Sequence, residues 1–120
     1  MLRQAAVKGG MVPLCTYSET LPFPDESFER VIMVDALHHV YNHARTAAEL
    51  WRVVKPGGRI VIEEPNIQNP TVWVVAILEK VGLMRSHFIS PQRIAKLFSE
   101  SLARVFVKKN GYTAWIIVEK

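Results

Sequence analysis

Residues 21–65 read LPFPDESFERVIMVDALHHVYNHARTAAELWRVVKPGGRIVIEEP, and this stretch decides the fold. It contains a short apolar run at residues 31–34 and a second one at residues 60–62, with a helical pattern and a Pro-Gly-Gly turn between them. Nearly continuous apolar runs are typical of strands covered on both faces. A helical crossover between two such strands favours a parallel and adjacent pair. The sequence therefore predicts an α/β fold in which both strands end at the same edge of one sheet.

That edge is the expected ligand site. Ligands of open α/β sheets bind just beyond the carboxyl ends of the strands. Residues 35–39 follow the first predicted strand and residues 63–66 follow the second. We expect these two segments to lie side by side.

Three motifs in this stretch point to one family. They are Leu21-Pro22-Phe23 with Asp25 and Ser27-Phe28-Glu29, then Ala36-Leu37-His38-His39, then the helix end Val54-Lys55-Pro56-Gly57-Gly58. In this order and spacing they resemble class I S-adenosylmethionine-dependent methyltransferases, of the group with ubiquinone-biosynthesis-like and arsenite-type members. Singly each motif is weak, because Pro-Gly-Gly after a helix is ordinary helix-stop chemistry. The resemblance covers the middle of the chain closely and the later segments in outline.

The resemblance implies a Rossmann-like methyltransferase sheet, with parallel strands and a C-terminal antiparallel hairpin. It also implies S-adenosylmethionine as cofactor and a small-molecule methyl acceptor. It assigns six residues to cofactor binding: Tyr17, Ser18, Glu19, Asp35, Ala36 and Leu37. Residues 35–37 would face the methionine end, and Tyr17 stands where the family has an acidic residue for adenine. The alternative for Tyr17 is an edge or capping aromatic.

The glycine-rich loop of the family is the missing piece. Only Gly9-Gly10 precede the matching stretch, although glycine is what permits close backbone approach to a ligand. We therefore expect an N-terminally truncated sheet in one partial domain over residues 1–120. Residues 31–34 then form an open edge, which a strand at residues 11–16, a second copy in a homodimer or a complementary chain would cover.

Candidate catalytic and substrate residues also lie at the rim. His38 and His39 can shuttle a proton near neutral pH, and packing is the alternative role. Glu64 and Asn66 are candidates for holding the acceptor, although strand-end carboxylates are often simply hydrated. Trp73 belongs to a segment at residues 72–78 that is apolar nearly all round, so we expect a partner chain, the loop at residues 83–89 or a hydrophobic substrate to cover it. The resemblance implies that this segment shapes the substrate pocket, which is consistent with a hydrophobic or aromatic acceptor.

No metal site is predicted, because the histidine pair has only His43 as an obvious additional ligand. The net charge is +4, but the basic residues are scattered along the chain, a pattern that does not favour nucleic-acid binding. Cys15 is the sole cysteine, which excludes an internal disulfide and favours a reducing, cytoplasmic location. Residues 72–78 fall far short of the ~20 residues that span a bilayer.

Local signals mark the remaining elements. Asn42 is a helix N-cap, and Ser90 followed by Pro91 starts another helix. Strands at residues 103–109 and 112–120 are joined by Asn110-Gly111, the preferred pair for a type I′ turn.

Two hypotheses of function remain open. The chain transfers a methyl group from S-adenosylmethionine to oxygen, nitrogen, sulfur or arsenic, a reaction that depends mainly on positioning. Alternatively, it is a non-catalytic methyltransferase-like module, or a subunit that needs a partner for the glycine-rich loop.

Overall fold

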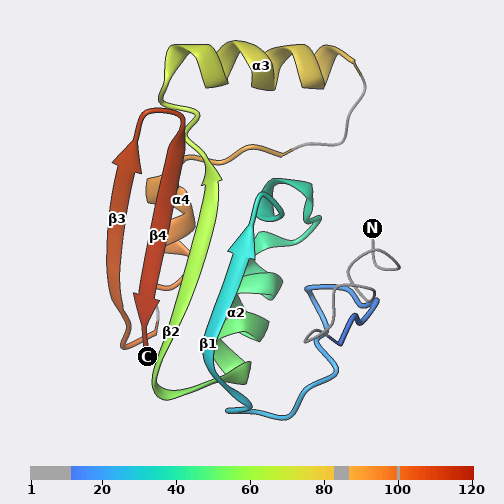
Figure 1. Cartoon of the computed structure of the whole chain (residues 1–120), viewed down its shortest axis with the longest axis vertical. Coiled ribbons are helices and arrows are strands. Elements are labelled where there is room, and N and C mark those ends of the chain that lie inside the picture. The colour runs from blue at the N-terminus through green and yellow to red at the C-terminus, as the bar shows by residue number, and fades with distance from the viewer. Residues whose placement is uncertain (1–11, 83–86, 100) are drawn as a thin grey trace.

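The computed structural model describes residues 12–82, 87–99 and 101–120 (Figure 1). Its elements in chain order are β1 (Phe28–Val34), the 3-10 helix η1 (Leu37–His39), α2 (His43–Val53), β2 (Val54–Pro65), α3 (Pro70–Val81), α4 (Pro91–Lys96), β3 (Arg104–Asn110) and β4 (Thr113–Glu119). The four strands form one sheet in the order β1-β2-β4-β3. β1 is parallel to β2, whereas β4 is antiparallel to both of its neighbours. The predicted parallel pair and terminal antiparallel hairpin are confirmed.

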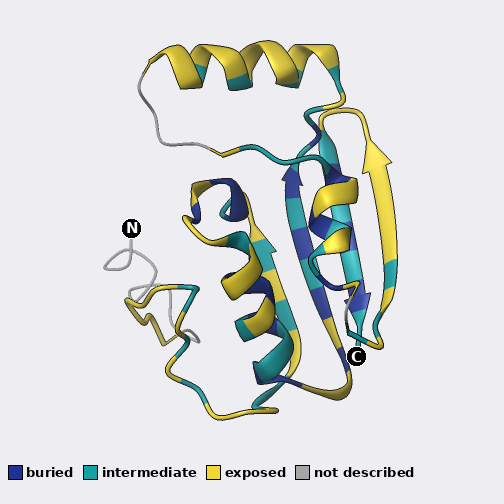
Figure 2. Ribbon diagram, turned by 180° about the vertical axis from the view of Figure 1, so that it is seen from behind, coloured by how far each residue is buried: buried dark blue, intermediate teal, exposed yellow. Residues whose placement is uncertain are grey.

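α2 and α4 cover one face of the sheet, and the core lies between them and the strands (Figure 2). Side chains on this face are almost fully buried: Ile60, Ile62, Ile116 and Val118 from the strands, with Leu50, Ile94 and Phe98 from the helical side. Burying each large aliphatic side chain contributes about 1.5–3 kcal/mol. We name this side of the sheet the covered face and the opposite side the open face.

The expectation that β1 is buried on both sides is wrong for the described residues. Ile32 is 69% exposed and Val34 is 51% exposed, because both side chains point to the open face. Val31 and Met33, on the covered face, pack against the core. In the described part of the chain, α2 and α4 contact the sheet from the covered face, and α3 lies beyond the ends of the strands (Figure 2).

The strand predicted at residues 11–16 is also wrong where the structure describes it. Residues 12–16 contain no strand, and Val12 and Leu14 are exposed. Pro13 lacks an N–H to donate to a ladder, and little apolar burial stabilises an extended segment here. Pairing of this segment with β1 is therefore excluded for residues 12–16, while Met11 lies outside the described residues.

Helix caps follow the sequence closely. The Asn42 side chain accepts a hydrogen bond from the Arg45 N–H at 3.0 Å, and the Ser90 side chain accepts one from the Arg93 N–H at 3.4 Å. Each cap satisfies a backbone donor that the first turn leaves without a helical partner. The two predicted helix starts are confirmed.

The β3–β4 turn is shifted by one residue from the prediction. Asn110 pairs with Thr113, so the two turn residues are Gly111 and Tyr112. Gly111 has a φ of +56°, and Tyr112 is not among the residues with positive φ. A positive φ at only the first turn position fits type II′ rather than type I′.

The loop at residues 21–27 is held against α2 by an ion-pair network. Arg52 donates to both carboxylate oxygens of Glu49, at 2.7 and 2.8 Å, and to Asp25 at 2.8 Å. Glu49 also accepts from the Leu21 N–H at 2.7 Å. The hydrogen bonds from the Arg52 guanidinium are the main cause that lowers the pKa of Glu49 from 4.5 to about 2.

Candidate cofactor and acceptor site

The site is built at the rim where β1 and β2 end side by side. The Asp35 N–H donates to the Glu63 carbonyl at 3.0 Å, which continues the parallel pairing by one residue. Asp35 has a φ of +45°, a left-handed conformation that Asp tolerates better than most residues. This conformation turns the chain out of β1 and into η1.

Glu64 holds the segment after β1 through three hydrogen bonds. Its Oε1 accepts from the N–H groups of Ala36 at 3.0 Å and Leu37 at 2.6 Å. Its Oε2 lies 2.5 Å from His38 Nδ1. Glu64 is 3% exposed and His38 is 7% exposed, so the donors satisfy a carboxylate that would otherwise be costly to bury. We name these contacts the Glu64 clamp.

Two aromatic side chains also contact the His38 ring. It stacks on Phe88, with ring centroids 4.6 Å apart and planes 9° from parallel, and lies 4.0 Å from the His39 ring centroid. The His38 carbonyl also accepts from the His87 N–H at 2.6 Å. These contacts favour a positioning role for His38, whereas His39 is exposed. Catalytic roles for the two histidines stay predictions.

A pocket of about 290 Å³ lies between α3 and the rim. Its lining residues are Asp35, Glu63, Pro65, Thr71, Val72, Val75, Tyr112 and Thr113. Glu63 Oε2 accepts a hydrogen bond from Trp115 Nε1 at 2.7 Å. Within the described residues, the Asp35 carboxylate has no hydrogen bond or ion pair. Two carboxylates beside an apolar helix wall suit a ligand with a positively charged group and an apolar body.

A different pocket, of about 390 Å³, lies beside the start of α2. It is lined by Tyr17 and Glu19, and Ser18 lies between them in the chain. Glu19 accepts from the Asn42 N–H at 3.2 Å, and the Ser18 hydroxyl lies 3.1 Å from that of Thr46. Burial opposes ionisation of Glu19, but hydrogen bonds from backbone N–H groups and Ser18 together lower its pKa. This segment therefore does not share the Asp35 pocket, and its cofactor role stays a prediction.

The three candidate substrate residues have different environments. Glu64 is committed to the clamp, and Asn66 joins the end of β2 to the hairpin turn, because its N–H donates to the Tyr112 carbonyl at 2.7 Å. Trp73 lies on α3, 57% exposed, and does not line the 290 Å³ pocket. Their contact with an acceptor stays a prediction.

The sequence placed Glu63 on the predicted rim without selecting it as a candidate residue, and it missed Thr113 as a pocket residue. The signal was present in the alternation of β2: Ile60, Ile62 and Glu64 share one face, so Glu63 must point to the other. No such signal marks Phe88, which reaches His38 from a segment far along the chain.

This fold is similar to that of solved S-adenosylmethionine-dependent methyltransferases. Such an enzyme from Thermotoga maritima, described as a possible histamine N-methyltransferase, matches with a TM-score of 0.83 at 21% identity, over 98% of this chain and 68% of that chain. One from Methanosarcina mazei matches with a TM-score of 0.72 at 16% identity, over 99% and 76%. The chain belongs to the Methyltransferase domain family, whose model matches residues 1–62.

Curated relatives support the same family. The ubiquinone/menaquinone biosynthesis C-methyltransferase of Bartonella tribocorum is 29% identical in an alignment 125 positions long. The alignment covers 95% of this chain and 46% of that protein. The demethylmenaquinone methyltransferase of Mycobacterium sp. (strain KMS) is 41% identical over 66 residues, which cover 55% and 28%. The chain thus spans less than half the length of these relatives.

The family implies S-adenosylmethionine as the cofactor, and the rim fits one part of it. The Asp35 and Glu63 carboxylates suit the positive charges of its sulfonium and amino groups. Residues 11–56 contain no glycine that would let the backbone approach the cofactor closely. The rim therefore fits the methionine end of the cofactor, and that stretch offers no glycine cradle for the remainder.

Among the described residues, no helix is long and apolar enough to cross a membrane.

Proposed function

We propose that this chain carries the methyl-donor and acceptor side of a methyltransferase site and takes part in methyl transfer to a small-molecule acceptor. The observation that carries the proposal is the Glu64 clamp, which fixes residues 36–38 at the rim where family members bind the cofactor. S-adenosylmethionine supplies an electrophilic methyl group on a sulfonium centre. Methyl transfer depends on in-line positioning of the reacting atoms, which a rigid rim favours.

Each part of the pocket has a separate role in the proposal. Asp35 and Glu63 attract positive charge, and the clamp orients the backbone at residues 36–37. Val72 and Val75 of α3 provide an apolar wall, which suits a hydrophobic or aromatic acceptor. Aromatic C-methylation agrees with the names of the quinone-biosynthesis relatives.

Calorimetric titration of the purified chain with S-adenosylmethionine tests the proposal. We expect saturable binding, weakened about tenfold in Glu64→Gln, a change that corresponds to about 1.4 kcal/mol. Glu29→Gln is the matched control, because Glu29 is exposed at the opposite end of β1. Absence of heat at millimolar cofactor contradicts binding by the chain alone.

A second candidate function is that of a subunit or non-catalytic module completed by a partner. In the described residues β1 pairs only with β2, so its outer edge offers free backbone groups. A groove of about 360 Å³ runs beside this edge, with Leu21, Phe23 and Phe28 among its lining residues. A structural neighbour from Haloferax volcanii, with a TM-score of 0.79 at 15% identity, was solved in complex with a methyltransferase activator.

Sedimentation and amide exchange test this candidate. A homodimer sealed along β1 predicts a concentration-dependent mass and slow exchange at Ile32 and Val34. A monomer at micromolar concentration with fast exchange at both amides contradicts the homodimer. Cofactor binding that appears only after a complementary chain is added supports the subunit. The cytoplasmic location expected from Cys15 stays a prediction.

A further inference from the structure

The open face of the sheet is ordered in rows that run across the four strands. Residues paired between neighbouring strands share a face, and the next row on that face lies two residues along. The first row consists of Arg30, Arg59, Glu119 and Arg104. The second consists of Ile32, Val61, Ile117 and Phe106, and the third of Val34, Glu63, Trp115 and Lys108.

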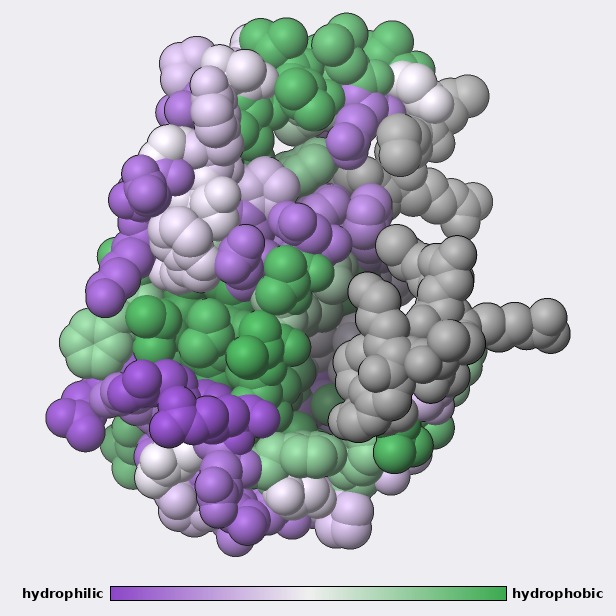
Figure 3. All heavy atoms as spheres, in the orientation of Figure 1, coloured by the Kyte–Doolittle hydropathy of each residue, from purple (hydrophilic) through white to green (hydrophobic). Residues whose placement is uncertain are grey.

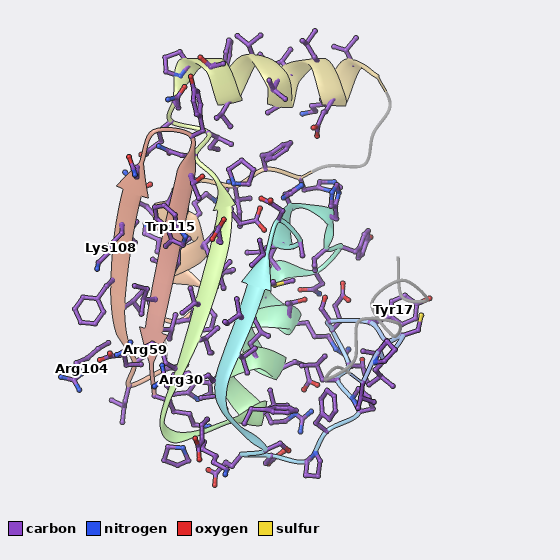
Figure 4. All side chains as sticks on the ribbon, in the orientation of Figure 1. Tyr17, Arg30, Arg59, Arg104, Lys108 and Trp115 are labelled. Carbon is purple, nitrogen blue, oxygen red and sulfur yellow. The ribbon has the colours of Figure 1, made fainter. Side chains whose placement is uncertain are left out.

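The first row, the arginine row, carries excess positive charge. Three guanidinium groups accompany one carboxylate, since Glu119 pairs with Arg59 at 2.6 Å and with Arg104 at 3.8 Å. Arg30 has no ion pair within the described residues. Figure 4 shows the three labelled arginines at one level across the strands. The row therefore retains capacity for additional carboxylates.

The second row, the apolar row, is wholly hydrophobic; its two outer residues are exposed, and Val61 and Ile117 between them are partly buried. Ile32 is 69% exposed and Phe106 is 48% exposed. Figure 3 shows this region as a hydrophobic band between two hydrophilic bands on the front of the molecule. A continuous apolar band of this kind, rimmed by charge, is typical of a protein–protein contact.

The third row joins the open face to the candidate site. Glu63 belongs to this row and also lines the pocket beneath α3, while Trp115 donates to it at 2.7 Å. Whatever covers the open face therefore lies next to the acceptor pocket.

We propose that the open face binds an amphipathic helix of a partner polypeptide, with its apolar stripe on the apolar row and acidic residues on the arginine row. Successive rows are about 6.6 Å apart along a strand, and the rise between helix residues four apart is about 6 Å. A helix lying along the strands can therefore place such residues on two successive rows. The arginines select carboxylates, because guanidinium groups pair with them in bidentate geometry.

Two other occupants fit the charge pattern poorly. Residues 1–11 contain Arg3 and Lys8 but no Asp or Glu, so they offer the arginine row no carboxylate. If two copies packed open face to open face about a two-fold axis, the arginine row of one copy would face either the arginine row or the third row of the other. The direction of the axis decides which. The third row contains one carboxylate and also Lys108, so neither arrangement neutralises the arginines.

A pair of designed peptides tests the proposal without reference to methyl transfer. Both are 18-residue helices with the same Leu and Ala stripe; one carries four Glu residues near one end, and the other carries Lys at those positions. Calorimetry and backbone amide shifts are measured with the whole chain at physiological salt. We expect the acidic peptide to bind at least tenfold more tightly and to shift the amides of Ile32, Val61 and Ile117.

Matched charge reversals sharpen the test. Arg30→Glu on the open face is expected to weaken acidic-peptide binding about tenfold. Arg93→Glu changes an exposed position of α4, behind the sheet, and is expected to alter binding by no more than about twofold. Amide spectra are to be recorded for both variants as a control that each remains folded. Equal binding of the two peptides, no binding of the acidic peptide, shifts confined to α3, or a dimer formed through the open face would each overturn the proposal.

Discussion

Neighbouring residues of β4 lie on the two faces of the sheet and have opposite environments. Ile116 is fully buried on the covered face, whereas Ile117 is only partly buried on the open face. The same contrast separates Glu64, which is 3% exposed and clamped, from the half-buried Glu63 at the pocket beside α3. Stability therefore comes mainly from the covered face, while the open face and its rim are available for binding.

Alanine substitution at Ile116 and Ile117 should produce the largest difference between the two faces. Ile116→Ala leaves a cavity in the core and is expected to lower the free energy of unfolding by about 2–5 kcal/mol. Ile117→Ala removes the same atoms from a half-covered position and is expected to cost about 1 kcal/mol or less. Urea unfolding measures both values. Equal losses would show that the open face is packed as tightly as the covered one.

The two adjacent glutamates give the next largest contrast. Glu64→Gln replaces an acceptor-only carboxylate by an amide, so one of the donors at Ala36, Leu37 or His38 loses its partner, and we expect a loss of about 1–3 kcal/mol. Glu63→Gln retains an oxygen for the Trp115 N–H and is expected to cost about 0.5 kcal/mol or less. Thermal unfolding compares them; a larger loss for Glu63→Gln would contradict the clamp.

The smallest expected effect is a pH dependence from the network at Glu49. Its pKa is about 2 in the folded chain against 4.5 ordinarily, so the unfolded state binds more protons between these values. The stability that this carboxylate contributes is full above about pH 4.5 and is lost as the pH falls toward 2.

Glu49→Gln is the matched variant for this dependence. We expect its unfolding midpoint to fall less steeply than that of the parent chain between pH 4.5 and 2. Identical slopes would mean that Arg52 does not hold the Glu49 carboxylate in solution.

Periodicity and local chemistry account for what the sequence predicted. The apolar runs at residues 31–34 and 60–62 gave the parallel pair, and Asn42 and Ser90 marked their helices. Both-sided burial of β1 failed because an apolar run reports the preference of its side chains and not the presence of a covering layer. The shift of the hairpin turn to Gly111 reflects strand register, which a dipeptide alone does not determine.

The candidate site was predictable in position and less so in the roles of its residues. Adjacent parallel strands end at the same edge of a sheet, so the sequence was sufficient to place residues 35–39 beside residues 63–66. The role of each carboxylate depends on the face to which its side chain points. Glu64 accepts hydrogen bonds from the backbone and contacts His38, whereas Asp35 and Glu63 line the pocket. The contact of Phe88 with His38 is purely tertiary and leaves no local pattern in the sequence.

The most direct test of the account is an amide-resolved titration of the chain with S-adenosylmethionine. If the rim of β1 and β2 forms the methyl-donor site, the largest shifts fall at the amides of residues 35–37, 63, 64 and 66, and Glu64→Gln diminishes them. Saturable binding whose shifts fall elsewhere, or no shift at millimolar cofactor, would contradict the account.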